Sequence, residues 1–336
     1  MKALFNLTIY VFTMVGAQSQ AQMKLGGDTT VVFATIDEAR QILTNQDDFI
    51  RRLSPFDRAA RMKTSNPVSE EVFLNFVGTN VLAWNDAERQ KVASAFRGIQ
   101  TELEALSLPL PQKLFVIKTT GDEEGKADYT RANAIVIPKD HLTAPTADFE
   151  KIISHELFHV LSRANPDLRE AFYAAIGFAG CSEVAFPVEM KQRKITNPDA
   201  PRNDHCVRLQ VDGKACWAIP LLFSSAEKYD PGRGGEFFDY LQFQFLLVDR
   251  DENTSRVKPI YEGQKPKLVE VGEGSGFFEQ VGRNTQYIIH PEEILADNFS
   301  LLVLQRSNLP SPAIIKKMEV ILKQRKISGT RSEPPR

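Results

Sequence analysis

Cysteine and histidine are both scarce in this chain of 336 residues, which contains three cysteines and five histidines. No two cysteines stand in a Cys-x-x-Cys arrangement, so the sequence lacks the thiolate pairs typical of structural zinc sites. An excess of charge is lacking too, because 41 basic residues are matched by 43 acidic ones, for a formal net charge of -2. No basic stretch with interleaved aromatic residues occurs, and we therefore expect no nucleic-acid partner.

Long apolar runs are absent, except for one near the N-terminus that extends over residues 3–16. This run follows a lysine and precedes small residues that offer cleavage sites after Ala17 or Ala21. The pattern predicts a signal peptide over residues 1–21 and hence a secreted or periplasmic protein, with a buried N-terminal strand or an uncleaved anchor as the alternative. No other segment is apolar for long enough to predict a stable membrane span.

Three cysteines in an exported protein are consistent with one disulfide and one spare thiol. The segments 207–211 and 214–219 flank Asp212-Gly213, which predicts a hairpin with a two-residue turn. In that register Cys206 and Cys216 point to opposite faces of the hairpin and cannot form a bridge. We therefore predict a Cys181–Cys206 disulfide, with Cys216 packed among apolar side chains.

The most informative stretch is His-Glu-Leu-Phe-His, from His155 to His159. Apolar residues recur at helical spacing around it and predict a buried helix. Two imidazoles four positions apart then project from one face, which is the geometry for chelating one zinc ion. Glu156 comes forward on a neighbouring part of that face, where it can accept a proton from a water on the metal without binding the metal. The alternative is a pair of core histidines that hydrogen-bond to backbone carbonyls.

A hydrolytic zinc site needs a third protein ligand and keeps its fourth position for water. A third histidine in the common downstream position is excluded, because Asn165 stands there and Ser162 replaces the required glycine. A later helix that begins near Pro291 offers Glu293 and, four residues on, Asp297 on the same face. Between Pro291 and Glu293, Glu292 is expected to be an ordinary solvated acid at a helix start.

Glu170 and Glu183 are nearer rivals for the third position. Ala174 and Pro187 stand four residues after them, so neither rival has an acidic partner at the spacing that orients a ligand imidazole. We therefore favour Glu293.

Together, the His-Glu-x-x-His motif and the Glu293–Asp297 pair resemble the gluzincins, the thermolysin-like branch of the zincin metallopeptidases. The resemblance implies that His155, His159 and Glu293 bind zinc, that Glu156 is the general base, and that Asp297 accepts a hydrogen bond from a ligand imidazole. It also implies an α+β, zincin-like fold, in which the edge strand of a small mixed sheet precedes the motif helix. The interval between His159 and Glu293 is much longer than in thermolysin.

The segments 113–118 and 132–137 are predicted to be strands upstream of the motif helix. In the second, Asn133-Ala134 resembles the dipeptide with which the thermolysin edge strand binds its substrate; the alternative is an ordinary core strand. Gluzincins also place a tyrosine or a histidine near the metal as a donor to the oxyanion, and the resemblance makes Tyr287 and His290 the candidates. The alternatives are a strand end for Tyr287 and a helix cap for His290.

We expect one metallopeptidase-like domain over residues 22–327, followed by a disordered polar tail at residues 328–336. Four parts follow one another within the domain: a mainly helical N-terminal part (22–110), a unit of strands and the motif helix (111–175), a strand-rich inserted lobe (180–285), and C-terminal helices of which the first carries the third ligand (286–327). An insertion as long as the lobe is expected to fold beside the metal and narrow the cleft.

The sequence thus predicts an exported zinc-dependent hydrolase that holds one Zn²⁺ ion and cleaves peptide or protein substrates. One alternative is a catalytically inactive zincin-fold protein that binds zinc or a partner, against which the intact Glu156 argues. A second is a structural or adhesion protein in which the motif is fortuitous. The substrate sequence, the choice between endo- and exopeptidase action, and the oligomeric state do not follow from the residues.

Overall fold

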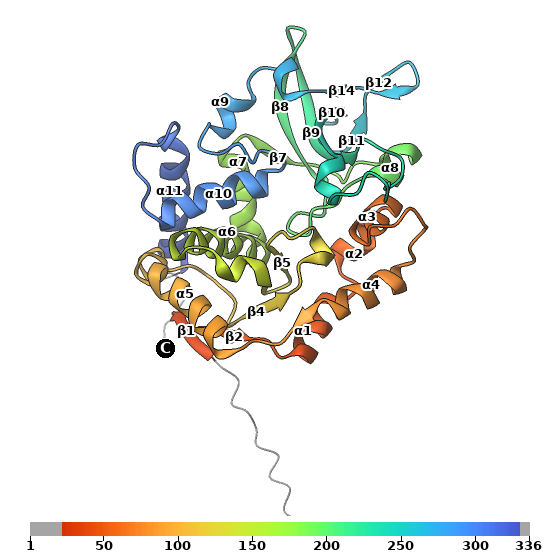
Figure 1. Ribbon diagram of the computed structural model, residues 1–336. Helices are drawn as coiled ribbons and strands as arrows, with labels where there is room; N and C mark the ends of the chain where they lie inside the picture. Colours follow the sequence, from red (N-terminus) through yellow and green to blue (C-terminus); the bar gives the residue numbers. More distant parts are fainter. Residues whose placement is uncertain (1–21, 330–336) are drawn as a thin grey trace, which may run out of the picture.

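The structure is a computed structural model that describes residues 22–329 (Figure 1). The predicted signal peptide, residues 1–21, and residues 330–336 of the predicted tail lie outside the described residues. The last helix, α11 (Pro312–Gly329), continues through residues 328 and 329, so the tail prediction is wrong for these two positions.

The described chain has a mixed sheet of six strands, seen in the lower part of Figure 1. The strand order is β1 (Gln22–Gly26), β2 (Thr29–Phe33), β4 (Lys113–Thr119), β6 (Ala134–Pro138) and β5 (Tyr129–Arg131), with the short β3 (Val81–Leu82) paired to β4. The three central strands are parallel, whereas β1 and β5 run antiparallel to their neighbours at the two edges. Strands and helices are thus mixed along the chain, and the predicted α+β class is confirmed.

Both faces of this sheet are covered, which explains why its central strands are apolar at successive positions. Leu114 and Ile135 point into one core, whereas Ile117 and Val136 point into the other. The first core lies under two long helices, α5 (Asp86–Leu106) and α6 (Thr146–Ala164). The second lies under shorter helices, α1 (Ile36–Leu43), α2 (Asp48–Arg52) and α4 (Glu70–Thr79).

The N-terminal part was predicted to be mainly helical, and it does contain α1 to α5, including α3 (Pro55–Arg61). Its first two elements, however, are the strands β1 and β2, which pair as an antiparallel hairpin and were missed. The side chains of Leu25, Val31 and Phe33 pack into the core under α5, so burial in the sheet decides the structure of this segment.

The inserted lobe is strand-rich, as predicted, and forms a second, antiparallel sheet. Its order is β11 (Val257–Pro259), β10 (Leu241–Arg250), β9 (Lys214–Ser224), β8 (His205–Val211) and β7 (Phe178–Gly180), with β14 (Leu268–Val269) beside β10. The predicted β8–β9 hairpin is confirmed: Leu209 faces Cys216, and both turn residues, Asp212 and Gly213, have positive φ. The lobe also contains the hairpin β12 (Tyr261–Glu262) and β13 (Lys265–Pro266) and the helices α8 (Val188–Arg193) and α9 (Phe277–Val281).

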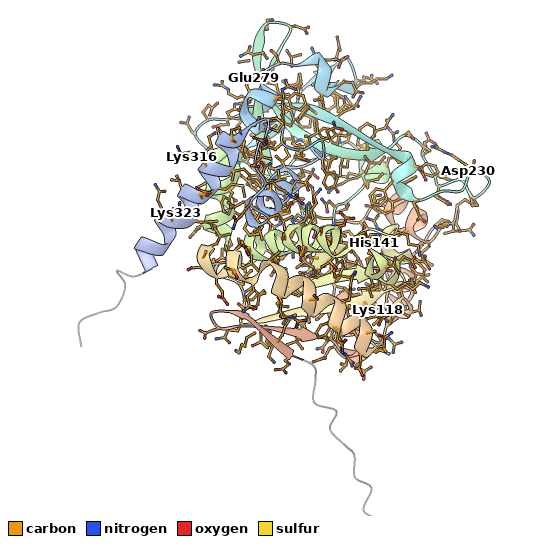
Figure 2. The ribbon with its side chains drawn as sticks, turned by 60° about the vertical axis from the view of Figure 1, so that its left-hand side comes forward. Lys118, His141, Asp230, Glu279, Lys316 and Lys323 are labelled. Carbon is orange, nitrogen blue, oxygen red and sulfur yellow. The ribbon has the colours of Figure 1, made fainter. Side chains whose placement is uncertain are left out.

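Helix α6 lies between the two sheets (Figure 1), where it packs against α5, α7 (Pro166–Ala175) and α10 (Pro291–Val303). One continuous core joins these helices to the inner face of the lobe sheet, through residues such as Phe158, Phe299 and Phe245. Figure 2, turned by 60°, shows α11 on the outside of this group with Lys316 and Lys323 along it. Within residues 22–329, no helix combines the length and apolarity needed to cross a bilayer.

All three cysteines are free thiols, so the predicted Cys181–Cys206 disulfide is not formed. The prediction paired the right neighbours, because Cys181 directly follows β7 and Cys206 lies on the adjacent β8, in one apolar cluster. The thiol of Cys206 donates a hydrogen bond to the Ala179 carbonyl over 3.6 Å. A hydrogen bond that Cys181 donates to Cys206, together with burial, raises the pKa of Cys181. The two residues therefore meet as thiols rather than as a bridge.

Candidate metal centre

The motif helix α6 is exposed in its first turn but mostly buried from Phe149 to Ser162, the stretch that carries its two histidines. Phe149, Ile153 and Leu157 fix one side of the helix in the core. His155 and His159 stand four positions apart on another side, with 15% and 1% of their side chains exposed. The imidazole ring centroids are 4.8 Å apart. The helix thus brings both rings to one point, as the spacing predicts.

Helix α10 supplies the third candidate ligand. Its first turn holds Pro291, and the imidazole of His290 caps it by accepting a hydrogen bond from the Glu292 N–H. Glu293 Oε2 lies 3.1 Å from His155 Nε2 and 3.5 Å from His159 Nε2. Two atoms bound to one zinc at about 2.0–2.1 Å in a tetrahedron are about 3.4 Å apart. The two observed distances are close to that separation.

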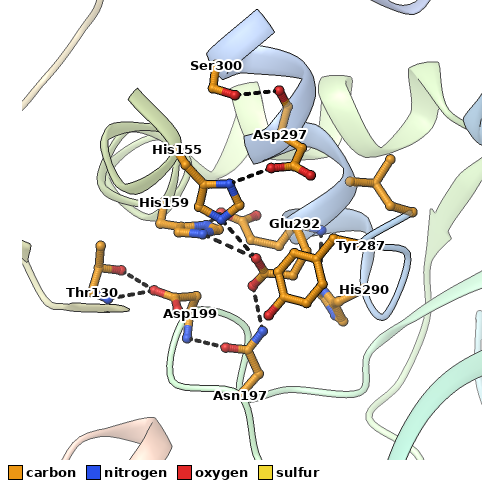
Figure 3. Close-up of polar contacts among 12 residues, drawn as sticks. Thr130, His155, His159, Asn197, Asp199, Tyr287, His290, Glu292, Asp297 and Ser300 are labelled. Carbon is orange, nitrogen blue, oxygen red and sulfur yellow. Dashed lines mark hydrogen bonds and ion pairs between the residues drawn. The ribbon is translucent and has the colours of Figure 1, made fainter. Parts of the chain in front are cut away.

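The remaining imidazole nitrogens are held by carboxylates of the same helix (Figure 3). His155 Nδ1 lies 3.0 Å from Asp297 Oδ1, and Asp297 is itself held by the Thr285 hydroxyl. His159 Nδ1 lies 3.1 Å from Glu292 Oε1. Both rings are therefore fixed so that Nε2 faces the shared point, which is the role of carboxylates behind metal-binding histidines.

The structure corrects the interpretation of Glu292, which was expected from the sequence to be a solvated acid at the helix start. Only 2% of the residue is exposed. Besides His159, it accepts hydrogen bonds from the hydroxyls of Ser162 and Tyr173, at 2.8 and 2.5 Å. These donors stabilise the ionised form, so the pKa of Glu292 is lowered although burial alone would raise it. Glu292 therefore orients the ring of His159 as Asp297 orients the ring of His155.

The site has more acidic groups than basic ones, and the titration of its imidazoles reflects this. Burial alone would lower the pKa of His155, but hydrogen bonds to Asp297 and Glu293 raise it to about 10. The pKa of His159 is also raised, against burial, by Asp199, Glu293 and Glu292. These carboxylates thus favour positive charge at the two rings, which a bound metal cation would provide.

Glu156 lies next to this group without belonging to it. The acid is 4% exposed, and its Oε2 has no hydrogen-bond partner among residues 22–329. Burial raises the pKa of Glu156 well above its usual value, and nearby Asp199 adds to the effect. A carboxylate with a raised pKa beside a metal position is suited to accepting a proton.

The donor set fits zinc on two counts. Two imidazoles and one carboxylate are a ligand set of catalytic zinc, which keeps a further position for water or substrate. The buried Nε2 of His159 makes no well-formed hydrogen bond to any described residue, although buried polar atoms seldom lack a partner. A metal at the shared point would satisfy it.

Two residues near this point were not foreseen from the sequence. Asn197 donates a hydrogen bond of 2.6 Å from its Nδ2 to Glu293 Oε1, the oxygen that faces away from the imidazoles. Asp199 lies beside Glu156 and His159, with one candidate ligand atom of each within 4.8 Å of the others. Both belong to the stretch Thr-Asn-Pro-Asp-Ala-Pro, whose composition indicates a turn-rich loop and gives no hint of what it contacts. Figure 3 shows both residues across from the α10 carboxylates.

The two proposed oxyanion donors lie in different places. Tyr287 lies beside the site, with its ring 6.3 Å from that of His155. Burial, then Glu293 and Asp199, raise the pKa of its hydroxyl, although 42% of the residue is exposed. His290 caps α10 instead, and burial together with His205 lowers its pKa to about 4. The helix-cap alternative is therefore the one that His290 adopts.

The prediction for Asn133-Ala134 is wrong, because β6 is not an edge strand. Ala134 is fully buried between β4 and β5, and the Asn133 side chain donates to the Lys113 carbonyl. The edge of the sheet is β5, a strand of three residues that precedes β6 and was not predicted. The strand that can pair with an extended peptide is therefore β5.

The rival ligands lie elsewhere. Glu170 pairs with His205 Nε2 at 3.0 Å, and Glu183 pairs with Arg52 at 2.7 Å. Each carboxylate already has a partner outside the group formed by His155, His159 and Glu293. Sequence spacing therefore identified the residues that the fold brings together.

Two cavities adjoin the site. The larger one, of about 530 Å³, is lined by Arg131, Ala132, Arg163, Asp199 and Glu292 among others. The smaller one, of about 40 Å³, is lined by Asp128, Tyr129, Asn197, Asp199 and Tyr287 among others. Asp199 lines both, and the two cavities touch opposite ends of β5.

Neither protein-family models nor curated proteins nor solved structures gave a match to this chain, so its function has to be argued from the residues of the site.

Proposed function

We propose that this protein is a zinc-dependent hydrolase, specifically a peptidase, in which His155, His159 and Glu293 bind one zinc ion. The observation that carries the proposal is the convergence of their three donor atoms, with Glu293 Oε2 at 3.1 and 3.5 Å from the two Nε2 atoms. The carboxylates of Asp297 and Glu292 behind the rings add support, because they fix the orientation that metal binding needs.

A zinc ion held by His155, His159 and Glu293 would supply a Lewis acid, able to polarise a scissile carbonyl and to acidify the attacking water. Glu156 has the position and the raised pKa to accept the proton of that water and to pass it to the leaving amine. Tyr287, whose hydroxyl stays protonated because its pKa is raised, is the candidate donor to the oxyanion. The burial of Glu156 and His159 keeps these exchanges away from bulk water.

A peptide is the substrate class that best matches the surroundings of the site. Strand β5 is the edge strand beside the site, and pairing with an edge strand is a common mode of peptide binding; its outward Thr130 N–H is bonded to Asp199 and would have to be released. The two cavities at its ends can accept side chains on either side of the scissile bond. The cavity of about 530 Å³ is large enough for a bulky side chain.

The arrangement of the elements supports the proposed resemblance to gluzincins. A mixed sheet with an antiparallel edge strand is followed by the motif helix α6, and a later helix, α10, supplies the acid. This supports a zincin-like fold with a large lobe inserted between the two helices. The expectation that the protein is exported rests on the N-terminal sequence pattern alone.

A catalytically inactive zinc-binding protein is the second candidate function. The observation that favours it is the loop around Asn197 and Asp199, which lies against the metal ligands where a substrate would have to enter. Hydrolysis by the purified protein, or its absence in a zinc-loaded sample, separates the two candidates.

The test compares zinc content and peptide hydrolysis in four purified proteins. The wild type is expected to hold one zinc per chain by elemental analysis, and His159→Ala to hold none after dialysis. Glu156→Gln is expected to keep its zinc and to lose hydrolysis by several orders of magnitude. Glu183→Ala, whose carboxylate pairs with Arg52, is the control and should match the wild type in zinc. A zinc-free wild type after loading at neutral pH would refute the proposal.

A further inference from the structure

One loop of the inserted lobe closes the candidate metal centre from the side opposite α10. This loop, residues 195–201, is called the covering segment here. Its first part is anchored in the interior: Thr196 binds the Asp57 carboxylate through its backbone N–H, at 3.0 Å, and through its hydroxyl, at 2.8 Å. Its last part is tied back by Lys194, whose Nζ donates to the Pro201 carbonyl over 3.3 Å. The middle of the segment, with Asn197 and Asp199, lies at the candidate metal centre.

The carboxylate of Asp199 is hydrogen-bonded to Thr130, the middle residue of the edge strand. Its Oδ1 accepts hydrogen bonds from the Thr130 N–H at 2.8 Å and from the Thr130 hydroxyl at 2.5 Å. Thr130 is the central residue of β5 and pairs with Ile135 on its other side. A substrate backbone that extended the sheet would need the same N–H donor. Asp199 therefore holds a position that an extended peptide would use.

The same carboxylate lies next to His159, one of the three proposed ligands, and next to Glu156. A ligand atom of Asp199 lies within 4.8 Å of one on Glu156 and one on His159. Two of the atoms around this point, Glu156 Oε2 and His159 Nε2, are buried and have no hydrogen-bond partner among residues 22–329. The side chain of Asp199 itself is only 8% exposed. A cation near His159 Nε2 would give all three groups a partner, including the two atoms that find none among the described residues.

The covering segment also divides the space along β5. The larger cavity touches Arg131 and Ala132 at the end of the strand, and the smaller one touches Asp128 and Tyr129 at its start. Asp199 lines both, with Thr130 between the two ends. If Asp199 moved away, the two cavities that it lines would be free to join along β5, past Thr130.

We propose that Asp199 is a fourth, displaceable protein ligand of the zinc, which occupies the position of the attacking water and keeps the resting enzyme closed. The inference rests on the proposed zinc site of His155, His159 and Glu293. Opening exchanges two contacts of Asp199 for two contacts of the substrate: a backbone carbonyl takes the Thr130 N–H, and water or the scissile carbonyl takes the metal position. A ligand that needs the free metal position then binds only to open molecules, so its apparent affinity is reduced in proportion to the fraction that is open.

Asp199→Asn is the informative variant, because it keeps the size and the contact with Thr130 but removes the anionic ligand. Asp86→Asn, at an exposed position at the start of α5, is the matched control. We expect one zinc per chain in all three proteins. In samples loaded with Co²⁺, the visible absorption spectrum of Asp199→Asn should differ from those of wild type and Asp86→Asn, because one ligand has changed.

Acetohydroxamic acid, which needs a free metal position, probes access directly. Asp199→Asn should bind it at least about tenfold more tightly than wild type and hydrolyse an unstructured peptide faster by a similar factor. Thr130→Val, which removes one of the hydrogen bonds that hold Asp199, should shift both quantities in the same direction by a smaller amount.

Different results would overturn the proposed zinc site and the proposed role of Asp199. A wild-type protein without zinc would overturn the proposed function. Equal cobalt spectra and equal hydroxamate affinities, with one metal bound in every variant, would overturn the role of Asp199 alone. Loss of hydrolysis in Asp199→Asn with zinc retained would overturn it too, since it would make Asp199 part of the catalytic machinery rather than its cover.

Discussion

Glu292 links the two helices of the site, because its carboxylate on α10 is hydrogen-bonded to His159 on α6. Removing this carboxylate therefore tests whether the contact between the helices supports metal binding. Glu292 accepts hydrogen bonds from His159 Nδ1, from Ser162 and from Tyr173, and it is 2% exposed. A hydrogen bond to a charged group contributes about 1.5–3 kcal/mol and a neutral one about 0.5–1.5 kcal/mol. Glu292→Gln keeps the volume but removes the charge, so we expect the grip on His159 to weaken by about 1–2 kcal/mol. Zinc affinity should then fall by about 5- to 30-fold.

The assay is a zinc titration in competition with a chromogenic chelator at neutral pH. Glu279→Gln makes the same chemical change at an exposed position of α9, labelled in Figure 2, and should leave the affinity unchanged. Thermal unfolding of the metal-free proteins separates a loss of affinity from a loss of folding. Wild-type affinity in folded Glu292→Gln would show that the contact with His159 does not support metal binding.

Three further predictions concern other parts of the molecule. Tyr287→Phe should keep its zinc and lower kcat by roughly 10 to 1,000-fold, whereas unchanged peptide kinetics would leave Tyr287 a packing role only. Arg61→Met should lower the free energy of unfolding, measured with urea, by about 3–5 kcal/mol, because it leaves Asp57 and Glu124 as buried carboxylates without their shared cation. A decrease of less than about 1 kcal/mol would contradict this. His141 pairs with Asp128 at 2.7 Å, which raises its pKa above 6.5; the pair should therefore stabilise the fold fully below pH 6.5 and lose its effect as the pH rises through the folded-state pKa. A stability difference between wild type and His141→Gln that does not shrink from pH 6 to pH 9 would refute that assignment.

The features that could be predicted from the sequence are those set by local spacing. His155, Glu156 and His159 share one helix, so their relation follows from helical geometry once the apolar pattern predicts that helix. Asp297 four residues after Glu293 is a second relation of the same kind. The β8–β9 hairpin was predicted because its Asp-Gly turn fixes the register of both strands.

The features that were missed depend on contacts between distant segments. The same spacing rules made Glu292 a solvated acid, because nothing in the sequence shows that Ser162 and Tyr173 pack over it. Strand β5 has only three residues and no apolar alternation, so β6 was taken for the edge strand. Asp199 lies in a loop rich in proline and polar residues, and its partner Thr130 is far away in the chain.

The charges at the site argue for a cation there whatever reaction follows. Four buried or nearly buried carboxylates, Glu156, Glu292, Glu293 and Asp297, surround two imidazoles, and Asp199 adds a fifth. Uncompensated negative charge of this density is costly in an interior, and it favours protons on His155 and His159, whose pKa values are accordingly raised. A zinc ion would release those protons and take over their electrostatic role. Because three of the acids come from one helix and both histidines from another, the ion would also join α6 to α10 across the long inserted lobe. Metal binding and the stability of this helix pair should therefore be linked, so that zinc raises the unfolding free energy of the whole domain by mass action.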